Sequence, residues 1–249
     1  MSLNRRGFIA GLMTCPICAG LAMAEGAPKW VYEGKDGAAD WGKLDRKFEA
    51  CSIGSEQSPV DLRQPILADV GPLRIEWKAE AFDIENNGHT IEAEGHDMGG
   101  ILLDGKPFEL KQFHFHHPSE HALGGERTEM EAHFVHANQA GKLAVVGVLM
   151  KAGARNAEFA EIMSAAPGTE GKKTLAAPLN PAGLLPSDTK RFRYEGSLTT
   201  PPCSEGVRWF VFEQELSLSR DQLRAFANLY KVNTRSAQDA HGRRIEANE

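Results

Sequence analysis

Apolar and polar residues alternate along most of this chain, which is the pattern of strands with one buried face. The segment 73–77, Leu-Arg-Ile-Glu-Trp, shows the alternation clearly. The same period, or a mainly apolar version of it, predicts further strands at 82–85, 90–94, 109–116, 129–136, 143–150, 191–194 and 207–215. Segment 143–150 is nearly all apolar, as expected of a strand buried on both faces. Asn86-Asn87-Gly88, between two of these segments, predicts a tight turn.

Helical patterns are few. Apolar residues in 156–165 have helical spacing, and Ser219-Arg-Asp-Gln222 is a capping box that opens a second helix. Because strands are spread over the whole length, the chain is predicted to fold as one predominantly β domain with a few peripheral helices.

The first 24 residues predict an export signal rather than part of the fold. Arg5 and Arg6 precede an uncharged apolar run that ends in a small-x-small cleavage pattern. The paired arginines resemble a twin-arginine signal, with general secretory export left open. The run is too short and too rich in Gly and Ala for a membrane span, which needs about 20 apolar residues. We therefore predict that 1–24 is removed and that 25–249 is a single exported domain without stable membrane insertion.

The charge of the chain excludes one class of partner. The whole sequence carries a formal net charge of −6, and loss of the two leader arginines leaves 26 basic and 34 acidic residues. A nucleic-acid surface needs a basic face that displaces counterions. We therefore predict no nucleic-acid partner.

The four cysteines fall into two pairs. Cys15 and Cys18 form a CxxC in the apolar part of the leader, a position that argues against a redox or metal role. Cys51 and Cys203 remain in the exported chain. Two cysteines in an oxidising compartment most simply form one disulfide.

Histidines are concentrated in one stretch, because eight of the nine lie between His89 and His136. Side chains at i and i+2 of a strand share a face, so His114 and His116 point the same way. If the next predicted strand pairs with theirs, His133 meets them. Three imidazoles around one ion leave a fourth tetrahedral position open, which is the arrangement of a catalytic zinc site.

Two polar residues lie in phase with these histidines. Gln112 and Glu131 each precede a histidine by two residues on the same face, where each can fix the orientation of an imidazole. An HxH pair on its own is usually an ordinary pair of strand histidines. The third histidine and the two polar partners favour metal binding instead, although ligand type alone does not separate zinc from cobalt.

His117-Pro-Ser-Glu-His121 offers a competing interpretation, because it matches the HxxEH pattern of inverzincin peptidases. That motif must lie on a helix. Here a predicted strand runs into it, and Pro118 permits a helix only from that point onward. The peptidase interpretation is therefore disfavoured.

Taken together, these residues resemble the α-class carbonic anhydrases, in particular bacterial exported members. The blocks that carry the resemblance keep the family order and span nearly all of the exported chain. They are 57–62, 86–89, 112–116, 119–121, 131–136, 143–147 and 195–202, followed by Val207 and Trp209. The resemblance implies a large, twisted, mostly antiparallel central sheet with short peripheral helices. It also implies a Zn²⁺ cofactor and reversible hydration of CO2 to bicarbonate and a proton.

The resemblance assigns roles to single residues. His114, His116 and His133 match the zinc ligands. Thr199 matches a catalytic residue whose hydroxyl accepts a hydrogen bond from zinc-bound hydroxide and donates one to a buried glutamate, here Glu120. Because a carboxylate only accepts hydrogen bonds, it would orient that hydroxyl.

Further matches describe the substrate pocket and the proton path. The residues that match the wall around CO2 and bicarbonate are Val135, Val145, Leu198, Thr199, Thr200, Val207 and Trp209. His89 matches the proton shuttle, a role suited to a group that titrates near neutrality. Its place after a turn predicts an exposed, mobile side chain. Tyr32 and Asn87 match polar groups along the water chain. The implied mechanism is attack of zinc-bound hydroxide on CO2, followed by proton transfer through His89.

The resemblance also bears on location and partners. Cys51 and Cys203 match the disulfide of exported members, which implies a periplasmic protein whose partners are the small molecules CO2 and bicarbonate. A homodimer is compatible with the sequence. One departure is Thr234-Arg235, which stands where the family has a Trp-Arg pair and puts the packing there in doubt.

Two other functions are weighed against this one. A catalytically silent binding module of the same fold usually lacks a ligand histidine, and none is lacking here. A periplasmic zinc-buffering protein would not need Thr199 and Glu120 together. Side esterase activity toward activated esters is expected of any zinc hydroxide in an open cleft, so it would say little about the biological substrate.

Overall fold

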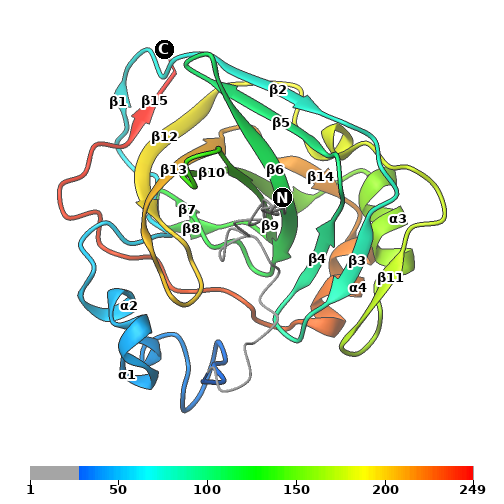
Figure 1. The fold of residues 1–249 in the computed structure, drawn as a ribbon, viewed down its shortest axis with the longest axis horizontal. Coiled ribbons are helices and arrows are strands. Elements are labelled where there is room, and N and C mark those ends of the chain that lie inside the picture. The colour runs from blue at the N-terminus through cyan, green and yellow to red at the C-terminus, as the bar shows by residue number, and fades with distance from the viewer. Residues whose placement is uncertain (1–27, 249) are drawn as a thin grey trace, which may run out of the picture.

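The computed structural model describes residues 28–248, so the predicted leader, with Cys15 and Cys18, lies outside the described residues. Thirteen strands form one large twisted sheet (Figure 1). These strands are β1 (Ile66–Leu67), β2 (Leu73–Trp77), β3 (Asp83–Asn86), β4 (Ile91–Glu94), β5 (Gly99–Leu103), β6 (Lys106–His116), β9 (Met130–Ala137), β10 (Leu143–Ala152), β11 (Gly171–Thr174), β12 (Arg191–Ser197), β13 (Glu205–Phe212), β14 (Leu216–Leu218) and β15 (Glu246–Ala247). A separate hairpin is formed by β7 (Ala122–Leu123) and β8 (Glu126–Arg127).

The main path through the sheet is β1-β15-β12-β13-β10-β9-β6-β4-β3-β11, with β5 beside β6, β2 beside β5, and β14 beside β10. Within 28–248 the parallel pairs are β1–β15, β10–β13 and β10–β14. The predicted fold class, a mainly β protein with a large, mostly antiparallel sheet, is confirmed. Each predicted strand is present, but the one expected at 207–215 ends early, because β13 stops at Phe212 and β14 begins at Leu216.

The helices are short and lie around the sheet (Figure 1). They are α1 (Trp41–Leu44), α2 (Ala50–Ile53), α3 (Ala157–Ala165) and α4 (Arg220–Leu229), with the 3-10 turns η1 (Arg46–Phe48) and η2 (Pro181–Leu184). The predicted capping box is confirmed, because Ser219 and Gln222 bond reciprocally at the start of α4. Gln222 also bonds to the backbone of Asn156, the residue that caps α3. The two predicted helices are therefore joined at their N-termini.

Strands β6 and β9 each have an apolar face and a polar face, and this difference positions the site. Phe113, Phe115 and Phe134 are fully buried in the largest core, which includes residues of α3 and α4. The histidines between them in sequence therefore point to the opposite face. Burial of each phenylalanine contributes about 2 kcal/mol. A slip of one residue would exchange the two faces, so this burial fixes the register.

Strand β10 is buried on both faces over Leu143–Met150, as its apolar sequence predicts. Ala144 and Val146 lie in the largest core, whereas Val145 lies in a second core together with Trp209. The second core is on the same side of the sheet as the histidines. It therefore supplies an apolar surface next to them.

The segment 28–53, here called the N-terminal arm, packs around a third small core. Its aromatic members are Trp30 and Trp41, and they lie with Cys51 and Cys203. Trp41 Nε1 donates a 2.8 Å hydrogen bond to the carbonyl of Val31, which closes the arm on itself.

Candidate metal centre

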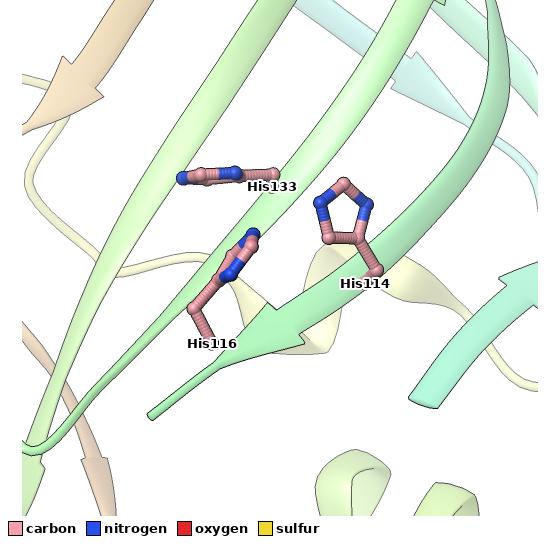
Figure 2. Close-up of side chains that lie close together, drawn as sticks. All are labelled: His114, His116 and His133. Atoms are coloured by element: carbon pink, nitrogen blue, oxygen red, sulfur yellow. The ribbon is translucent and has the colours of Figure 1, made fainter. Parts of the chain in front are cut away.

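Three histidines come together on the polar face of β6 and β9. His114 pairs directly with His133 across the two strands, and His116 lies two residues further along β6. One nitrogen from each ring can be chosen so that all three lie within 4.8 Å of one another. Figure 2 shows the three rings turned toward a common point. The strand alternation read from the sequence therefore places these side chains together.

Two of the rings are held by a hydrogen bond at Nδ1. His114 Nδ1 lies 2.7 Å from Gln112 Oε1, and His116 Nδ1 lies 2.8 Å from the backbone carbonyl of Asn233. Both partners can only accept, so each Nδ1 carries the proton and each Nε2 is left with a lone pair. Asn233 was missed by sequence reasoning, because the contact uses a backbone atom far along the chain.

The third ring has its other nitrogen next to a buried acid. His133 Nε2 lies 2.9 Å from Glu131 Oε1, which leaves His133 Nδ1 for a ligand. Burial on its own would raise the pKa of the Glu131 carboxyl, but His121 and His133 beside it hold that pKa well below its usual range. Glu131 therefore stays ionised and fixes the tautomer of His133.

His121 supports Glu131 from behind and was not predicted as a site residue. Its Nδ1 lies 2.7 Å from Glu131 Oε1, and its Nε2 lies 2.7 Å from the hydroxyl of Tyr194. Tyr194 in turn shares a 2.9 Å hydrogen bond with the hydroxyl of Ser58. His121, Glu131 and His133 form a second close group of candidate ligands. Because both ring nitrogens of His121 are engaged, this group orients the metal centre and is not a second one.

Burial favours the neutral form of His114 and His116. It lowers the pKa of His114 well below its usual value, and the neighbouring His116 and His133 lower it further. Burial also lowers the pKa of His116, against an opposing effect of Glu120. Neutral imidazoles are the form that binds a metal ion.

An unsatisfied nitrogen of His116 also indicates that this site fits a metal ion. His116 Nε2 is buried and has no hydrogen-bond partner within 28–248, although buried polar atoms are nearly always satisfied. An ion held by the three rings would satisfy it. Three neutral nitrogen donors with one open position are the donor set of catalytic zinc.

Glu120 lies beside this centre and is anchored through Arg235. Glu120 Oε1 accepts a 2.7 Å hydrogen bond from the backbone N–H of Arg235. Glu120 Oε2 is buried, lies 3.6 Å from His116 Nε2 and has no hydrogen-bond partner in the described part of the chain. The bond predicted from the Thr199 hydroxyl is therefore not formed at Oε2. Thr199 itself is buried in the loop between β12 and β13.

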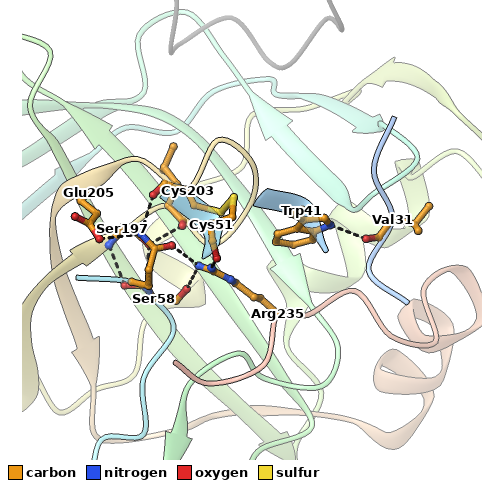
Figure 3. Close-up of a disulfide and its surroundings, with 10 residues drawn as sticks. Val31, Trp41, Cys51, Ser58, Ser197, Cys203, Glu205 and Arg235 are labelled. Carbon is orange, nitrogen blue, oxygen red and sulfur yellow. Dashed lines mark hydrogen bonds between the residues drawn. A yellow bond between two sulfur atoms is a disulfide. The ribbon is translucent and has the colours of Figure 1, made fainter. Parts of the chain in front are cut away.

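Arg235 connects Glu120 to the segment that carries the disulfide. Its guanidinium donates to Gln57 Oε1 at 2.9 Å, to the carbonyl of Ser58 at 2.8 Å and to the carbonyl of Cys51 at 2.8 Å (Figure 3). It is 1% exposed and lies 6.0 Å from the centre of the Trp41 ring. The departure at Thr234-Arg235 therefore leaves the arginine fully engaged.

The predicted disulfide between Cys51 and Cys203 is confirmed. Cys203 lies in the same loop as Thr199, and its carbonyl accepts a 3.1 Å hydrogen bond from Gln57 Nε2. The bond therefore ties this loop to α2 in the N-terminal arm (Figure 3).

Replacing Cys203 by serine is expected to lower the free energy of unfolding by about 3 kcal/mol and to loosen the Thr199 loop. Thermal unfolding should show a melting temperature lower by several degrees. The Cys51→Ser variant should match, because it removes the same bond. An unchanged melting temperature in both variants would count against this role.

The apolar pocket residues line the same face next to the histidines. Val145, Val207 and Trp209 are each 1% exposed, whereas Val135 and Leu198 are partly buried against them. Across the strands, Val145 pairs with both Val135 and Trp209. The Trp209 ring meets the His133 ring edge to face, with centres 4.8 Å apart. The apolar pocket residues are therefore in contact with His133, one of the candidate metal ligands.

On the other side of the three histidines, the residues that follow His114 across strands β4, β3 and β11 are charged. Glu92 pairs with His114, Glu85 pairs with Glu92, and Lys172 pairs with Glu85. Glu92 is only 7% exposed, and burial together with Glu94 and Glu85 raises its pKa to about 8. Sequence reasoning missed Glu92, because a glutamate that alternates with apolar residues in a strand is normally predicted to face solvent.

His89 differs from the exposed side chain that its turn predicts. It is partly buried and stacks on Trp30, with ring centres 3.8 Å apart and an interplanar angle of 8°. Asn87 Oδ1 accepts hydrogen bonds from the backbone N–H groups of His89 and Thr90, which holds the turn. Burial lowers the pKa of His89, and Glu170 opposes that effect.

The remaining predicted residues lie near this turn or in the Thr199 loop. The Tyr32 ring is 6.5 Å from the His89 ring, and burial raises the pKa of Tyr32 well above its usual value. Thr200 is partly buried, and its carbonyl accepts a 2.9 Å hydrogen bond from the N–H of Cys203.

Comparison with known proteins agrees with this geometry. Residues 36–249 match the family model of the eukaryotic-type carbonic anhydrases. A carbonic anhydrase of Pectobacterium carotovorum is 37% identical over 226 residues, which are 90% of this chain and 93% of that protein. A carbonic anhydrase of Neisseria gonorrhoeae is 38% identical over 216 residues, 86% of each chain. The structure of the α-carbonic anhydrase from Thermovibrio ammonificans with the inhibitor sulfanilamide has a TM-score of 0.86 and 40% identity, and the match covers 89% of this chain and 100% of that one.

Proposed function

Because the chain belongs to the eukaryotic-type carbonic anhydrase family, we propose that it catalyses the reversible hydration of CO2 to bicarbonate and a proton at the three-histidine centre. The observation that carries the proposal is how His114, His116 and His133 are held. His114 and His116 are each fixed by a hydrogen bond at Nδ1, and His133 Nε2 lies 2.9 Å from the Glu131 carboxylate, so the opposite nitrogen of each ring is left for a ligand.

In this proposal His114 Nε2, His116 Nε2 and His133 Nδ1 would hold Zn²⁺. When bound, the ion supplies a Lewis acid that lowers the pKa of water to near neutrality, for which carbonic anhydrase is the standard example. An imidazole binds a metal ion as a neutral ligand, so these three ligands would leave the positive charge of the ion undiminished. Gln112 and Glu131 keep the imidazole protons on the outer nitrogens.

Glu120 and Thr199 orient the attacking oxygen. Oε1 of Glu120 is occupied by the N–H of Arg235, so the buried Oε2 is left for one donor. A hydrogen bond from the Thr199 hydroxyl to Oε2 would fill that place. The carboxylate can only accept, so the hydroxyl would turn its lone pairs toward the reacting oxygen and select a partner that carries a proton.

The apolar wall holds CO2, and the opposite side removes the proton. CO2 has no net dipole, so the valines together with Leu198 and Trp209 can retain it without a polar contact. The proton leaves through water along Tyr32, Asn87 and Thr200 to His89, which passes it to buffer. Substrate and proton would thus enter and leave on different sides of the centre.

We also propose that the protein acts in the periplasm after removal of the leader at 1–24. The Cys51–Cys203 disulfide supports an oxidising compartment. Within residues 28–248, each helix is too short or too polar to cross a membrane.

Removing zinc with a chelator is expected to abolish CO2 hydration, and adding about one equivalent of zinc per chain should restore it. The measurement is stopped-flow CO2 hydration on residues 25–249, with metal content determined on the same sample. As a control, zinc is added back to the chelated protein in the presence of the inhibitor sulfanilamide, and CO2 hydration should then not recover. Full zinc occupancy with no hydration above buffer would contradict the proposed activity and favour the binding module.

A further inference from the structure

Glu170 lies directly over the turn that carries His89. It is the residue before β11, and Gly171 at the start of β11 pairs with Asn86 at the end of β3. The loop between α3 and β11 is also attached to this turn by a 3.0 Å hydrogen bond from Asn86 Nδ2 to the carbonyl of Pro167. These two attachments fix the position of Glu170 relative to residues 87–90.

Gly88 provides the space that Glu170 occupies. A Cβ atom added to Gly88 would lie 2.9 Å from Glu170 Oε1 and 3.2 Å from its Cδ, so a larger residue there would require the Glu170 side chain to move. Gly88 also has a φ of +83°, which favours glycine independently. The carboxylate of Glu170 therefore rests on the turn immediately before His89.

The surroundings of His89 contain few groups that can stabilise a positive charge on its ring. On its inner side His89 meets Trp30 and Tyr32, which bring apolar surface and a neutral hydroxyl. Burial against them disfavours a protonated imidazole, because the charge loses contact with water, although the face of the Trp30 ring attracts a cation. Tyr230, which also faces this turn, has its pKa raised to about 12 by burial and by Glu170, so it too is neutral. Among these neighbours Glu170 alone carries a charge, and that charge is negative.

We propose that Glu170 is a positioning residue for proton transfer, whose carboxylate stabilises the protonated form of His89. The inference rests on the proposed function. His89 takes a proton from the water chain and becomes imidazolium. Glu170 provides the opposing charge for as long as His89 carries the proton. The proton then passes to a buffer base, and His89 returns to its neutral form. Burial alone opposes the first of these steps, and Glu170 offsets that effect.

The test compares Glu170→Gln and Glu170→Lys with Glu161→Gln in the zinc-loaded protein. Glu161 is an exposed acid on α3, so its variant removes the same charge without touching the turn. NMR titration of the His89 ring should show a midpoint lower by about 0.5 pH units in Glu170→Gln and by about 1 unit in Glu170→Lys. High salt should reduce both shifts, because Glu170 is exposed to solvent.

Turnover provides the second readout. In dilute buffer, kcat should fall severalfold in Glu170→Gln, kcat/KM should stay unchanged, and added imidazole should restore kcat. Glu170→Asp should retain most of the wild-type rate. An unchanged His89 midpoint, or equal shifts in Glu161→Gln, overturns the proposal, as does an unchanged kcat despite a shifted midpoint. Because the NMR titration does not need CO2 hydration, an inactive wild type with shifted midpoints would count against the proposed function and leave the pairing of Glu170 with His89 intact.

Discussion

Replacing His114 by alanine is expected to lower CO2 hydration by roughly 10³-fold or more and to remove most of the bound zinc. His114 would supply one of three ring nitrogens, and its Nδ1 is already fixed by Gln112. Two imidazoles would bind the ion weakly and leave it with more than one open position. Stopped-flow hydration and metal analysis on the same samples measure both effects.

Two control variants separate a ligand from its neighbours. Gln112→Ala should weaken zinc binding by about 10–100-fold, and saturating zinc should restore most of its activity, because the ring itself remains. His117→Ala should keep both zinc and activity, since the Nδ1 of His117 faces the carbonyl of Lys231. The HxxEH interpretation would make His117 a zinc ligand, so it predicts that His117→Ala loses both zinc and activity. Stoichiometric zinc and a normal rate in His114→Ala would rule out the proposed ligand set.

Replacing Glu92 by glutamine is expected to stabilise the protein at alkaline pH by about 5 kcal/mol. The pKa of Glu92 is raised by burial from 4.5 to about 8, so the folded state resists ionisation that the unfolded chain accepts. Wild-type stability therefore carries no penalty from Glu92 below pH 4.5, loses free energy as the pH rises from 4.5 to 8, and is lowered by a constant amount above pH 8. Glutamine does not ionise, so the variant avoids this loss.

The expected signature is a gain that depends on pH. The melting temperature of Glu92→Gln should exceed that of the wild type by roughly 10 °C at pH 9 and should equal it near pH 4.5. Glu126→Gln is the matched control, because Glu126 is exposed on the separate β7–β8 hairpin. A gain of equal size at both pH values would show that packing, and not ionisation, is responsible.

The parts of the site that were predicted from sequence depend on local alternation. His114, His116 and His133 follow from a period of two residues along β6 and β9, and so do Gln112 and Glu131. Strand β6 has an irregular register between Leu110 and Gln112, which the sequence pattern does not reveal. The irregularity precedes the histidines, so their shared face was still predicted correctly.

The parts that were missed depend on contacts between distant segments. Asn233 supplies a backbone carbonyl, and no side-chain pattern marks such a contact. His121 and Tyr194 meet only after β12 has docked in the sheet. Trp30 stacks on His89 from the N-terminal arm, so a turn that appears exposed in sequence is covered in the fold.

The difference between local and distant contacts also bears on the order in which the site can assemble. His114, His116 and His133 lie on two strands that are neighbours in sequence, apart from the small β7–β8 hairpin. The apolar wall needs β10 to pair with β13 across the segment that contains α3, β11 and β12. Long loops close more slowly than short ones. During folding the three imidazoles can therefore gather before the CO2 pocket exists. Zinc present from the start would favour the β6–β9 pairing over competing registers.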